Sequence, residues 1–369
     1  AQNIPFFNYR GAFAAREDEF IEIIRDVIRR GAFIQQRDLT DFESALARYL
    51  GVKHALGVAN ATDGLIIAMK AVGIGPGAEV IFPSHTMVAS PAAVAHVGAT
   101  PVAVDCGPDH LIDPESAEAA VTQRTRAILP VQLNGRTCDM DAIQRIASKY
   151  DLLIIEDAAQ ALGSKFKGKA AGSFGLAAAF SFYPAKILGC LGDGGAVVTN
   201  DDEVARRISL LRDHGRNEHG VVETWGYNSR LDNMQAAILH AQFKSYADIV
   251  GRRRAIAALY DQLLSDLPNV SLPPAPESDP RHFDVFQNYE IEADKRDELR
   301  AHLSDNGVGT LIQWGGRAVH QYPGLGFNAH LPTTERLFER CLMLPLNMTI
   351  TDDEVRYVAS QIRSFYSAS

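Results

Sequence analysis

The sequence has few cysteines and no long apolar run. Its four cysteines are far apart, with no CxxC pair: Cys106, Cys138, Cys190 and Cys341. This spacing excludes a disulfide scaffold and favours reduced thiols over zinc ligands, so we expect a cytoplasmic protein without a metal site. No apolar run reaches the roughly 18 residues of a membrane span, and the first residues do not resemble a signal peptide. We therefore expect no membrane association.

The chain also lacks a surplus of basic residues. Its formal net charge is −9, which excludes the broad basic surface that nucleic-acid binding requires. Hydrophobic residues make up 46% and charged residues 22% of the chain, the composition of a folded protein rather than a disordered one. With 369 residues, the chain is long enough for more than one domain.

Short apolar runs alternate with segments of helical periodicity through the first 200 residues. The runs predict strands at 55–59, 79–82, 100–105, 127–131, 152–156, 178–182 and 196–199. Helices of ten or more residues are predicted between several of them, at 62–72, 88–97 and 139–150. This alternation is typical of an α/β fold with a mostly parallel sheet that is covered on both faces.

The pattern changes after residue 200. A long helical stretch is predicted from about Leu231 towards Leu264, and a proline-rich segment at 273–276 follows it. Beyond these prolines we predict a strand at 283–293 and helices at 296–306 and 352–366. We therefore expect a large domain over residues 1–250, with helices at its N-terminal end, and a smaller α+β domain over residues 251–369.

Three segments place reactive residues where predicted strands end. Asp157 follows the strand 152–156, Lys186 lies just beyond the strand 178–182, and Ala61, Thr62 and Asp63 open a helix. Ligands of parallel sheets bind at such ends, and the free N–H groups of a helix start favour anions. Taken singly, these residues are also typical of a helix cap, an exposed lysine and a plain helix start. Together they supply an anion cradle, an imine-forming amine and a carboxylate for a pyridinium nitrogen.

The same residues lie in longer motifs that resemble a known family. The motifs are the runs at 155–160 (Ile-Glu-Asp-Ala-Ala-Gln), 172–175, 180–186 (Phe-Ser-Phe-Tyr-Pro-Ala-Lys) and 192–196. They resemble the sugar aminotransferases of the DegT/DnrJ/EryC1/StrS family, which are fold type I pyridoxal-phosphate enzymes, over nearly the whole chain. The resemblance implies a fold type I aminotransferase with a large sheet domain and a smaller C-terminal domain.

The resemblance also implies a cofactor, pyridoxal 5′-phosphate, and residues that hold it. Lys186 would carry it as an internal aldimine and move protons, Asp157 would pair with its ring nitrogen, and Gln160 would lie beside its phenolic oxygen. The phosphate would contact Ala61, Thr62, Asp63, Ser181 and, from a partner subunit, Asn228. That last contact implies a homodimer with shared active sites. Either Met87 or His85 would cover the ring.

The implied reaction transfers an amino group from L-glutamate to a keto group, at C3 or C4, of a nucleotide-linked deoxysugar. The candidate residues for the sugar are Phe33, Gln35, Trp314, Arg317 and His320. The segment 131–135 (Val-Gln-Leu-Asn-Gly) departs from relatives that often have histidine and an aromatic residue there, which indicates an altered pocket.

Three other functions compete with this interpretation. A nicotinamide dehydrogenase would have its GxGxxG motif between a strand and a helix, whereas Gly73, Gly75 and Gly77 precede a predicted strand. A pyridoxal-phosphate sugar dehydratase of the related branch would have histidine in place of Lys186. A non-catalytic regulatory protein of this fold would have lost catalytic residues, whereas Lys186, Asp157 and Gln160 are all present.

Overall fold

A sheet of seven strands forms the centre of the computed structural model, which describes residues 2–367. Neighbouring strands are parallel except where β9 pairs with β1 and β8. In spatial order the strands are β1 (His54–Val58), β9 (Gly195–Thr199), β8 (Ala177–Ser181), β5 (Leu153–Asp157), β4 (Thr125–Ile128), β2 (Glu79–Pro83) and β3 (Thr100–Val104). The mostly parallel sheet predicted from the alternation is confirmed.

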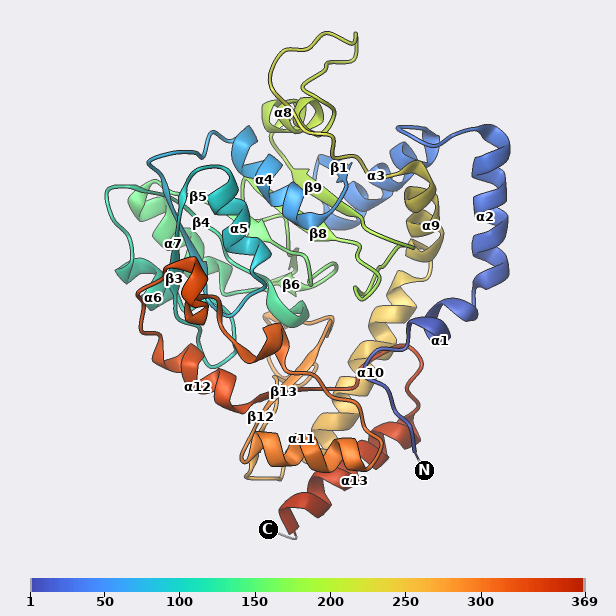
Figure 1. The fold of residues 1–369 in the computed structure, drawn as a ribbon, viewed down its shortest axis with the longest axis vertical. Helices are drawn as coiled ribbons and strands as arrows, with labels where there is room; N and C mark the ends of the chain where they lie inside the picture. Colours follow the sequence, from blue (N-terminus) through green and yellow to red (C-terminus); the bar gives the residue numbers. More distant parts are fainter. Residues whose placement is uncertain (1, 368–369) are drawn as a thin grey trace.

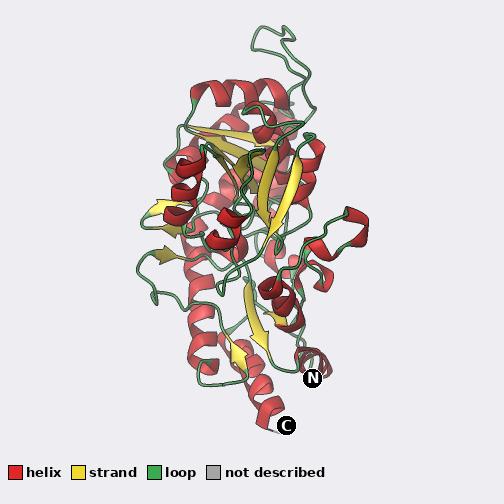
Figure 2. Ribbon diagram, turned by 90° about the vertical axis from the view of Figure 1, so that its left-hand side faces the viewer, coloured by secondary structure: helices red, strands yellow, loops and turns green. Residues whose placement is uncertain are grey.

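Helices cover both faces of this sheet (Figures 1 and 2). One face packs against α4 (Ala61–Ala71), α5 (Ala89–His96) and α8 (Asp202–Arg212). The other packs against α3 (Arg37–Leu50), α6 (Pro114–Ala119), α7 (Met140–Tyr150) and α9 (Asn233–Phe243). The N-terminal helices α1 (Tyr9–Ala14) and α2 (Glu17–Arg30) lie outside this layer, where α2 contacts α9. Because both faces are covered, the central strands are buried throughout, which explains their continuous apolar runs.

The C-terminal part forms a smaller α+β unit below the large sheet (Figure 1). Its sheet has the order β10-β12-β13, with β10 (Val270–Ser271), β12 (Tyr289–Ala293) and β13 (Cys341–Leu344). Its helices are α10 (Tyr246–Leu264), α11 (Arg296–Asp305), α12 (Pro332–Arg340) and α13 (Asp352–Ser367). A third small sheet joins the two parts, since β11 (His282–Phe283) pairs with the hairpin of β6 (Lys165–Phe166) and β7 (Lys169–Ala170).

The structure differs from the sequence expectations in the division of elements after residue 230. The strand expected at 283–293 is two strands, β11 and β12, because they pair in different sheets. The stretch from Leu231 to Leu264 is two helices, because α9 packs on α3 whereas α10 packs on α13, and one straight helix could not serve both. The expected domain boundary at residue 250 falls inside α10, and Ile4 packs in the core of the C-terminal unit, bridging to Val308. The N-terminal end of the chain therefore packs with the C-terminal unit, and the division into two domains at residue 250 stays a prediction.

Two further features concern the outside of the molecule. The segment 213–228 projects beyond α8 at the top of Figure 1 and carries Trp225, which is 95% exposed. Over residues 2–367, every helix is too short or too polar to cross a membrane.

Candidate active site

A cavity of about 780 Å³ opens at the carboxyl ends of β5 and β8, between the large sheet and the C-terminal unit. Its lining includes eight of the residues singled out from the sequence for the cofactor: Ala61, Thr62, Asp63, Met87, Asp157, Gln160, Ser181 and Lys186. They come from four separate segments of the chain. The topology brings them together because the carboxyl ends of parallel strands meet at one edge of a sheet.

Asp157 is the last residue of β5 and is 6% exposed. Its Oδ2 accepts a hydrogen bond of 2.7 Å from the Ser90 hydroxyl, and its Oδ1 accepts one of 3.1 Å from the Ala159 N–H. The residues after it form turns rather than a helix, so Asp157 does not cap a helix. Burial raises the pKa of Asp157, and the hydrogen bond from Ser90 and the charge of Lys186 offset part of that rise.

Lys186 lies in the loop after β8 and is half-buried. The loop is held by Gln287, whose Oε1 accepts from the Ile187 N–H at 2.9 Å and whose Nε2 donates to the Ala185 carbonyl at 2.8 Å. Both neighbours of Lys186 are thus tied to one side chain of the C-terminal unit. Burial lowers the pKa of Lys186, and the charge of Asp157 opposes this shift.

Lys186 and Asp157 influence each other electrostatically across the cavity without touching. Their charges shift each other's pKa, yet within residues 2–367 neither a hydrogen bond nor an ion pair joins them. A lysine whose pKa is lowered carries a larger share of neutral amine, the form that attacks a carbonyl. The arrangement therefore offers a nucleophilic amine and a buried acid with space between them.

The start of α4 forms a second polar region of the cavity. Asn60 caps the helix, because its Oδ1 accepts from the Asp63 N–H at 2.8 Å. The N–H groups of Ala61 and Thr62 have no partner within the described residues, so they are open to an anion. The strand β9 approaches this helix start closely, since a Cβ on Gly195 would lie 2.8 Å from the Ala61 nitrogen. The carboxylate of Asp63 accepts a 2.7 Å hydrogen bond from Ser229, so its side chain positions the segment after Asn228.

Met87 and His85 were the two candidates for covering a ring. Met87 lines the cavity and is 52% exposed, whereas His85 is fully buried outside it. The Nε2 of His85 lies 2.9 Å from Glu290, and its ring packs edge-on against Phe338. The expectation for His85 is therefore corrected: a partner on β12 draws its side chain away from the cavity.

Of the five candidate substrate residues, the structure brings only Trp314 to the cavity. His320 is buried between Ser84 and Glu335, at 2.7 and 3.0 Å, so it holds the fold together. Arg317, Phe33 and Gln35 are exposed and lie outside the cavity of their own chain. His320 does not reach the cavity because its partners hold it in the fold, and the sugar-binding roles expected of Arg317, Phe33 and Gln35 stay predictions.

Asn228 is also exposed and outside the cavity, on the projecting segment 213–228. The sequence interpretation assigned it to the site of a second copy, and that assignment stays a prediction.

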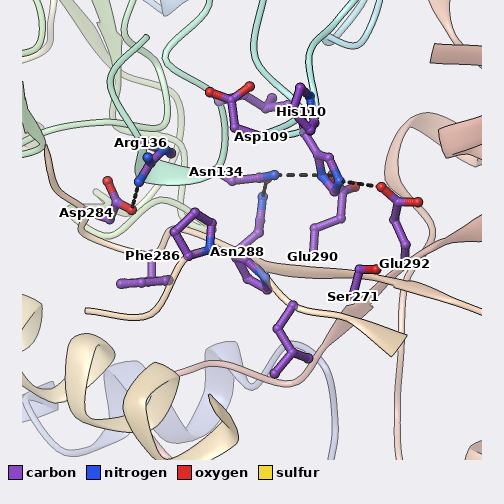
Figure 3. A pocket seen from close by; sticks show the side chains of 15 residues that line it. Asp109, His110, Asn134, Arg136, Ser271, Asp284, Phe286, Asn288, Glu290 and Glu292 are labelled. Carbon is purple, nitrogen blue, oxygen red and sulfur yellow. Dashed lines mark hydrogen bonds and ion pairs between the residues drawn. The ribbon is translucent and has the colours of Figure 1, made fainter. Parts of the chain in front are cut away.

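Sequence reasoning missed a buried polar cluster next to the cavity, centred on Glu290 of β12 (Figure 3). Glu290 is 2% exposed, and its Oε1 lies 2.8 Å from His110 Nδ1 and 2.9 Å from His85 Nε2. Asn134 and Gln313 also donate to its carboxylate. These residues come from distant parts of the chain and form no local motif, so no sequence signal would have grouped them.

The electrostatics of this cluster are strong. Burial would raise the pKa of Glu290, but the charges and hydrogen bonds of His85 and His110 outweigh it and hold the pKa well below its usual range. Burial would lower the pKa of His110, but the hydrogen bonds to Glu290 and Glu292 raise it to about 9. His85, His110 and Glu290 bring ligand-type atoms within 4.8 Å of one another. Their contacts of 2.8 and 2.9 Å are those of hydrogen bonds.

Comparisons with known proteins agree on one family. The model of the DegT/DnrJ/EryC1/StrS aminotransferase family matches residues 14–363. The chain is 41% identical over 368 residues to a dTDP-3-amino-3,4,6-trideoxy-alpha-D-glucose transaminase of Streptomyces venezuelae, covering 98% of this chain and 96% of the relative. It is 39% identical over 369 residues to a pleiotropic regulatory protein of Geobacillus stearothermophilus, covering 99% of each. The crystal structure of S. venezuelae DesV in complex with a ketimine intermediate superposes with a TM-score of 0.94 at 40% identity, covering 99% of each chain.

Proposed function

The chain belongs to the DegT/DnrJ/EryC1/StrS aminotransferase family, and from this premise we propose the reaction that it catalyses. It is a pyridoxal 5′-phosphate-dependent transaminase that moves an amino group from L-glutamate to a keto group, at C3 or C4, of a nucleotide-linked deoxysugar. The observation that carries the proposal is that Lys186 and Asp157 face one cavity, with shifted pKa values and no direct contact between them.

The residues around the cavity fit this cofactor. Its parts need a primary amine, an acid for the ring nitrogen and N–H donors for the phosphate. Lys186, Asp157 and the open N–H groups of Ala61 and Thr62 offer these groups. When bound, the cofactor supplies a protonated pyridine ring that takes up electrons from the carbon bearing the amino group.

Asp157 is the residue that would pair with the ring nitrogen and favour its protonated form. Its pKa is raised in the chain alone because it is buried without a cationic contact. A positively charged nitrogen placed against it would remove that penalty and favour the carboxylate. The Ser90 hydroxyl and the Ala159 N–H fix the two carboxylate oxygens, so Asp157 is positioned before any ligand binds.

Lys186 carries the proton. It is the only basic side chain that lines the cavity within the described residues, so its Nζ is the protein group able to move a proton at the reacting carbon. Its lowered pKa increases the share of neutral amine. Gln287 restrains the backbone on both sides of Lys186, which limits the movement of the Lys186 side chain at the cavity.

The substrate class and the oligomeric state are the next parts of the proposal. The names of similar proteins, such as the S. venezuelae transaminase, point to nucleotide-linked amino sugars as substrates. Both the cofactor and such a substrate carry phosphates, yet Lys186 is the single cation on the described lining. We therefore propose a homodimer in which Asn228 of the second copy, on its projecting segment, completes each site. Sedimentation of the loaded protein measures this state.

A regulatory role is the second candidate, because the G. stearothermophilus relative is named a pleiotropic regulatory protein. Such a protein would bind the cofactor without converting a substrate. The retained pair of Lys186 and Asp157 favours catalysis, and Lys186 itself argues against the dehydratase branch, which has histidine in its place.

The deciding experiment incubates the loaded protein with ¹⁵N-glutamate and a panel of nucleotide-linked 3-keto and 4-keto deoxysugars. We expect label in one amino sugar, with the labelled carbon located by NMR. Treatment with borohydride should fix the cofactor to the peptide that contains Lys186. Cofactor fixation without label transfer to any keto sugar would favour the regulatory role, and failure of both would overturn the proposed function.

A further inference from the structure

One wall of the cavity is built on the buried carboxylate of Glu290. An ionised carboxylate accepts hydrogen bonds and cannot donate them. Gln313 must therefore present its NH₂ group to Glu290, and its Nε2 lies 2.7 Å from Oε2. Asn134 must do the same, with its Nδ2 3.3 Å from Oε1. The charge of Glu290 thus decides which way both amides point.

The orientation passes on to a third amide. With its NH₂ turned to Glu290, Asn134 presents its Oδ1 as an acceptor, and this atom accepts from Gln313 Nε2 at 2.9 Å and from Asn288 Nδ2 at 3.0 Å. Figure 3 shows Asn134 and Asn288 joined in this way beside Glu290. The NH₂ group of Gln313 therefore makes two hydrogen bonds inside the wall, to Glu290 and Asn134, and that of Asn288 makes one, to Asn134.

The acceptor ends of the Asn288 and Gln313 side chains are unused within residues 2–367. Both residues line the cavity. The neighbouring Gln160 is turned the opposite way, because its Oε1 accepts from the Asn134 N–H at 2.8 Å, which leaves its NH₂ free. Gln160 thus offers a donor next to the cofactor, whereas the wall beyond it offers two acceptors.

We propose that Asn288 and Gln313 form a hydrogen-bond-accepting wall that selects sugars by their hydroxyl or N–H groups and disfavours sugars that carry a carboxylate there. This proposal rests on the proposed function and deepens it: the substrate is a neutral sugar with a hydrogen-bond donor on the ring face turned to this wall. A carboxylate would meet two amide oxygens that accept hydrogen bonds and donate none, so hydrogen-bond polarity opposes that contact.

The expected discrimination follows from the cost of an unmade hydrogen bond. A sugar that lacks the donor leaves acceptors of the wall without a partner, which weakens binding by about tenfold for each neutral hydrogen bond lost. An anion in the same place loses the bond and adds repulsion, so its binding falls further. Selectivity therefore resides in these two residues, apart from the chemistry at Lys186.

The test measures binding of unreactive probes to the loaded protein by calorimetry. The probes are a nucleotide-linked glucose, its deoxy analogues and the corresponding nucleotide-linked glucuronic acid, each with the same nucleotide. The variants are Asn288→Leu and Gln313→Met, which keep the side-chain size and remove the acceptor. Gln123→Met, at an exposed glutamine far from the cavity lining, is the matched control.

We expect the unaltered protein and the control to bind the glucose probe at least about tenfold more tightly than the glucuronic acid probe. Each wall variant should bind the glucose probe about tenfold more weakly and the glucuronic acid probe almost as before. The ratio of the two affinities should therefore approach one. An unchanged ratio in both variants, or tighter binding of the acid by the unaltered protein, would overturn the wall.

The choice of variants and the choice of probes allow the result to be interpreted. Asn288 contacts Asn134 and not Glu290, so Asn288→Leu leaves the buried anion paired even if Gln313→Met folds poorly. The probes are not turned over, so their affinities are independent of transamination. If the unaltered protein transfers no label from glutamate but still prefers the glucose probe over the acid probe, the proposed function alone is contradicted. If it transfers label but shows no such preference, the wall alone is contradicted.

Discussion

The two sides of the cavity each contain a buried carboxylate, and the two carboxylates behave in opposite ways. Asp157 is 6% exposed and Glu290 is 2% exposed, so burial is nearly the same. Burial raises the pKa of Asp157, whereas the neighbours of Glu290 overcome burial and lower its pKa. The difference lies in the partners, because Asp157 has a hydroxyl and an N–H, whereas Glu290 has two imidazoles and two amides.

The contrast indicates that Asp157 is suited to bind a cationic ligand, whereas Glu290 already has its partners within the protein. A buried carboxylate without a cation is destabilising until a positive group binds beside it. Asp157 is in that condition, and the cavity gives such a group access to it. Glu290 is fully paired within the chain, and its role is to orient other side chains. Three experiments would break or sharpen the comparison.

The largest effect should come from the amine that faces Asp157. Replacing Lys186 with alanine should lower transamination by about a thousandfold or more, because the chain has no other basic group on the described lining to move the proton. The free energy of unfolding of the cofactor-free protein should change by less than about 1 kcal/mol, since the side chain contributes little packing. The measurements are label transfer and denaturant unfolding, with Lys70→Ala on the exposed end of α4 as control. Near-normal transfer in the Lys186 variant would remove Lys186 from its assigned role.

The next effect compares the two carboxylates directly. In cofactor-free protein near pH 7, Asp157→Asn should be at least as stable as the original chain, because it removes an unpaired buried charge. Glu290→Gln should be less stable by about 3 kcal/mol, because it leaves two imidazoles without their anion. Urea unfolding of both variants checks this. Label transfer by the loaded Asp157→Asn variant should fall about a hundredfold, since a neutral amide does not keep the ring nitrogen protonated. Equal changes in stability for both variants would contradict the comparison.

The smallest effect is a pH dependence on the Glu290 side. The pKa of His110 is raised from its ordinary 6.5 to about 9, so the stability that it contributes is present below pH 6.5 and is lost as the pH rises through 9. The contribution is at most about 3 kcal/mol. The difference in unfolding free energy between the original chain and His110→Gln should therefore shrink between about pH 6 and pH 10. A difference that stays constant over this range would mean that His110 is not charged in the folded protein.

The Asp157 side of the cavity could be proposed from the sequence because its residues occupy short, contiguous segments. Asp157 and Ser181 end the strands β5 and β8, and Gln160 and Lys186 follow a few residues later, so the periodicity that predicts the strands also predicts where these residues emerge. The parallel sheet then brings them to one edge. The chemistry of each residue type supplies the rest of the inference.

The Glu290 side could not be proposed in this way. Its members, Asn134, Asn288 and Gln313, are separated in sequence by up to 179 positions and share no spacing. His85 and His320 are polar residues near the site in sequence, but the carboxylates of Glu290 and Glu335 hold their rings in the fold. Residue type alone could not tell such a histidine from a ligand-binding one.

The sequence by itself determined the alternation of strands and helices, the family and the reactive groups at the ends of β5 and β8, because these depend on local periodicity and contiguous motifs. Only the tertiary structure decided which polar residues face the cavity, where the long helical stretch divides and how the amides of the wall are turned. These depend on contacts between segments far apart in the chain, and a hydrogen bond's direction is set by the partner that folding places beside it.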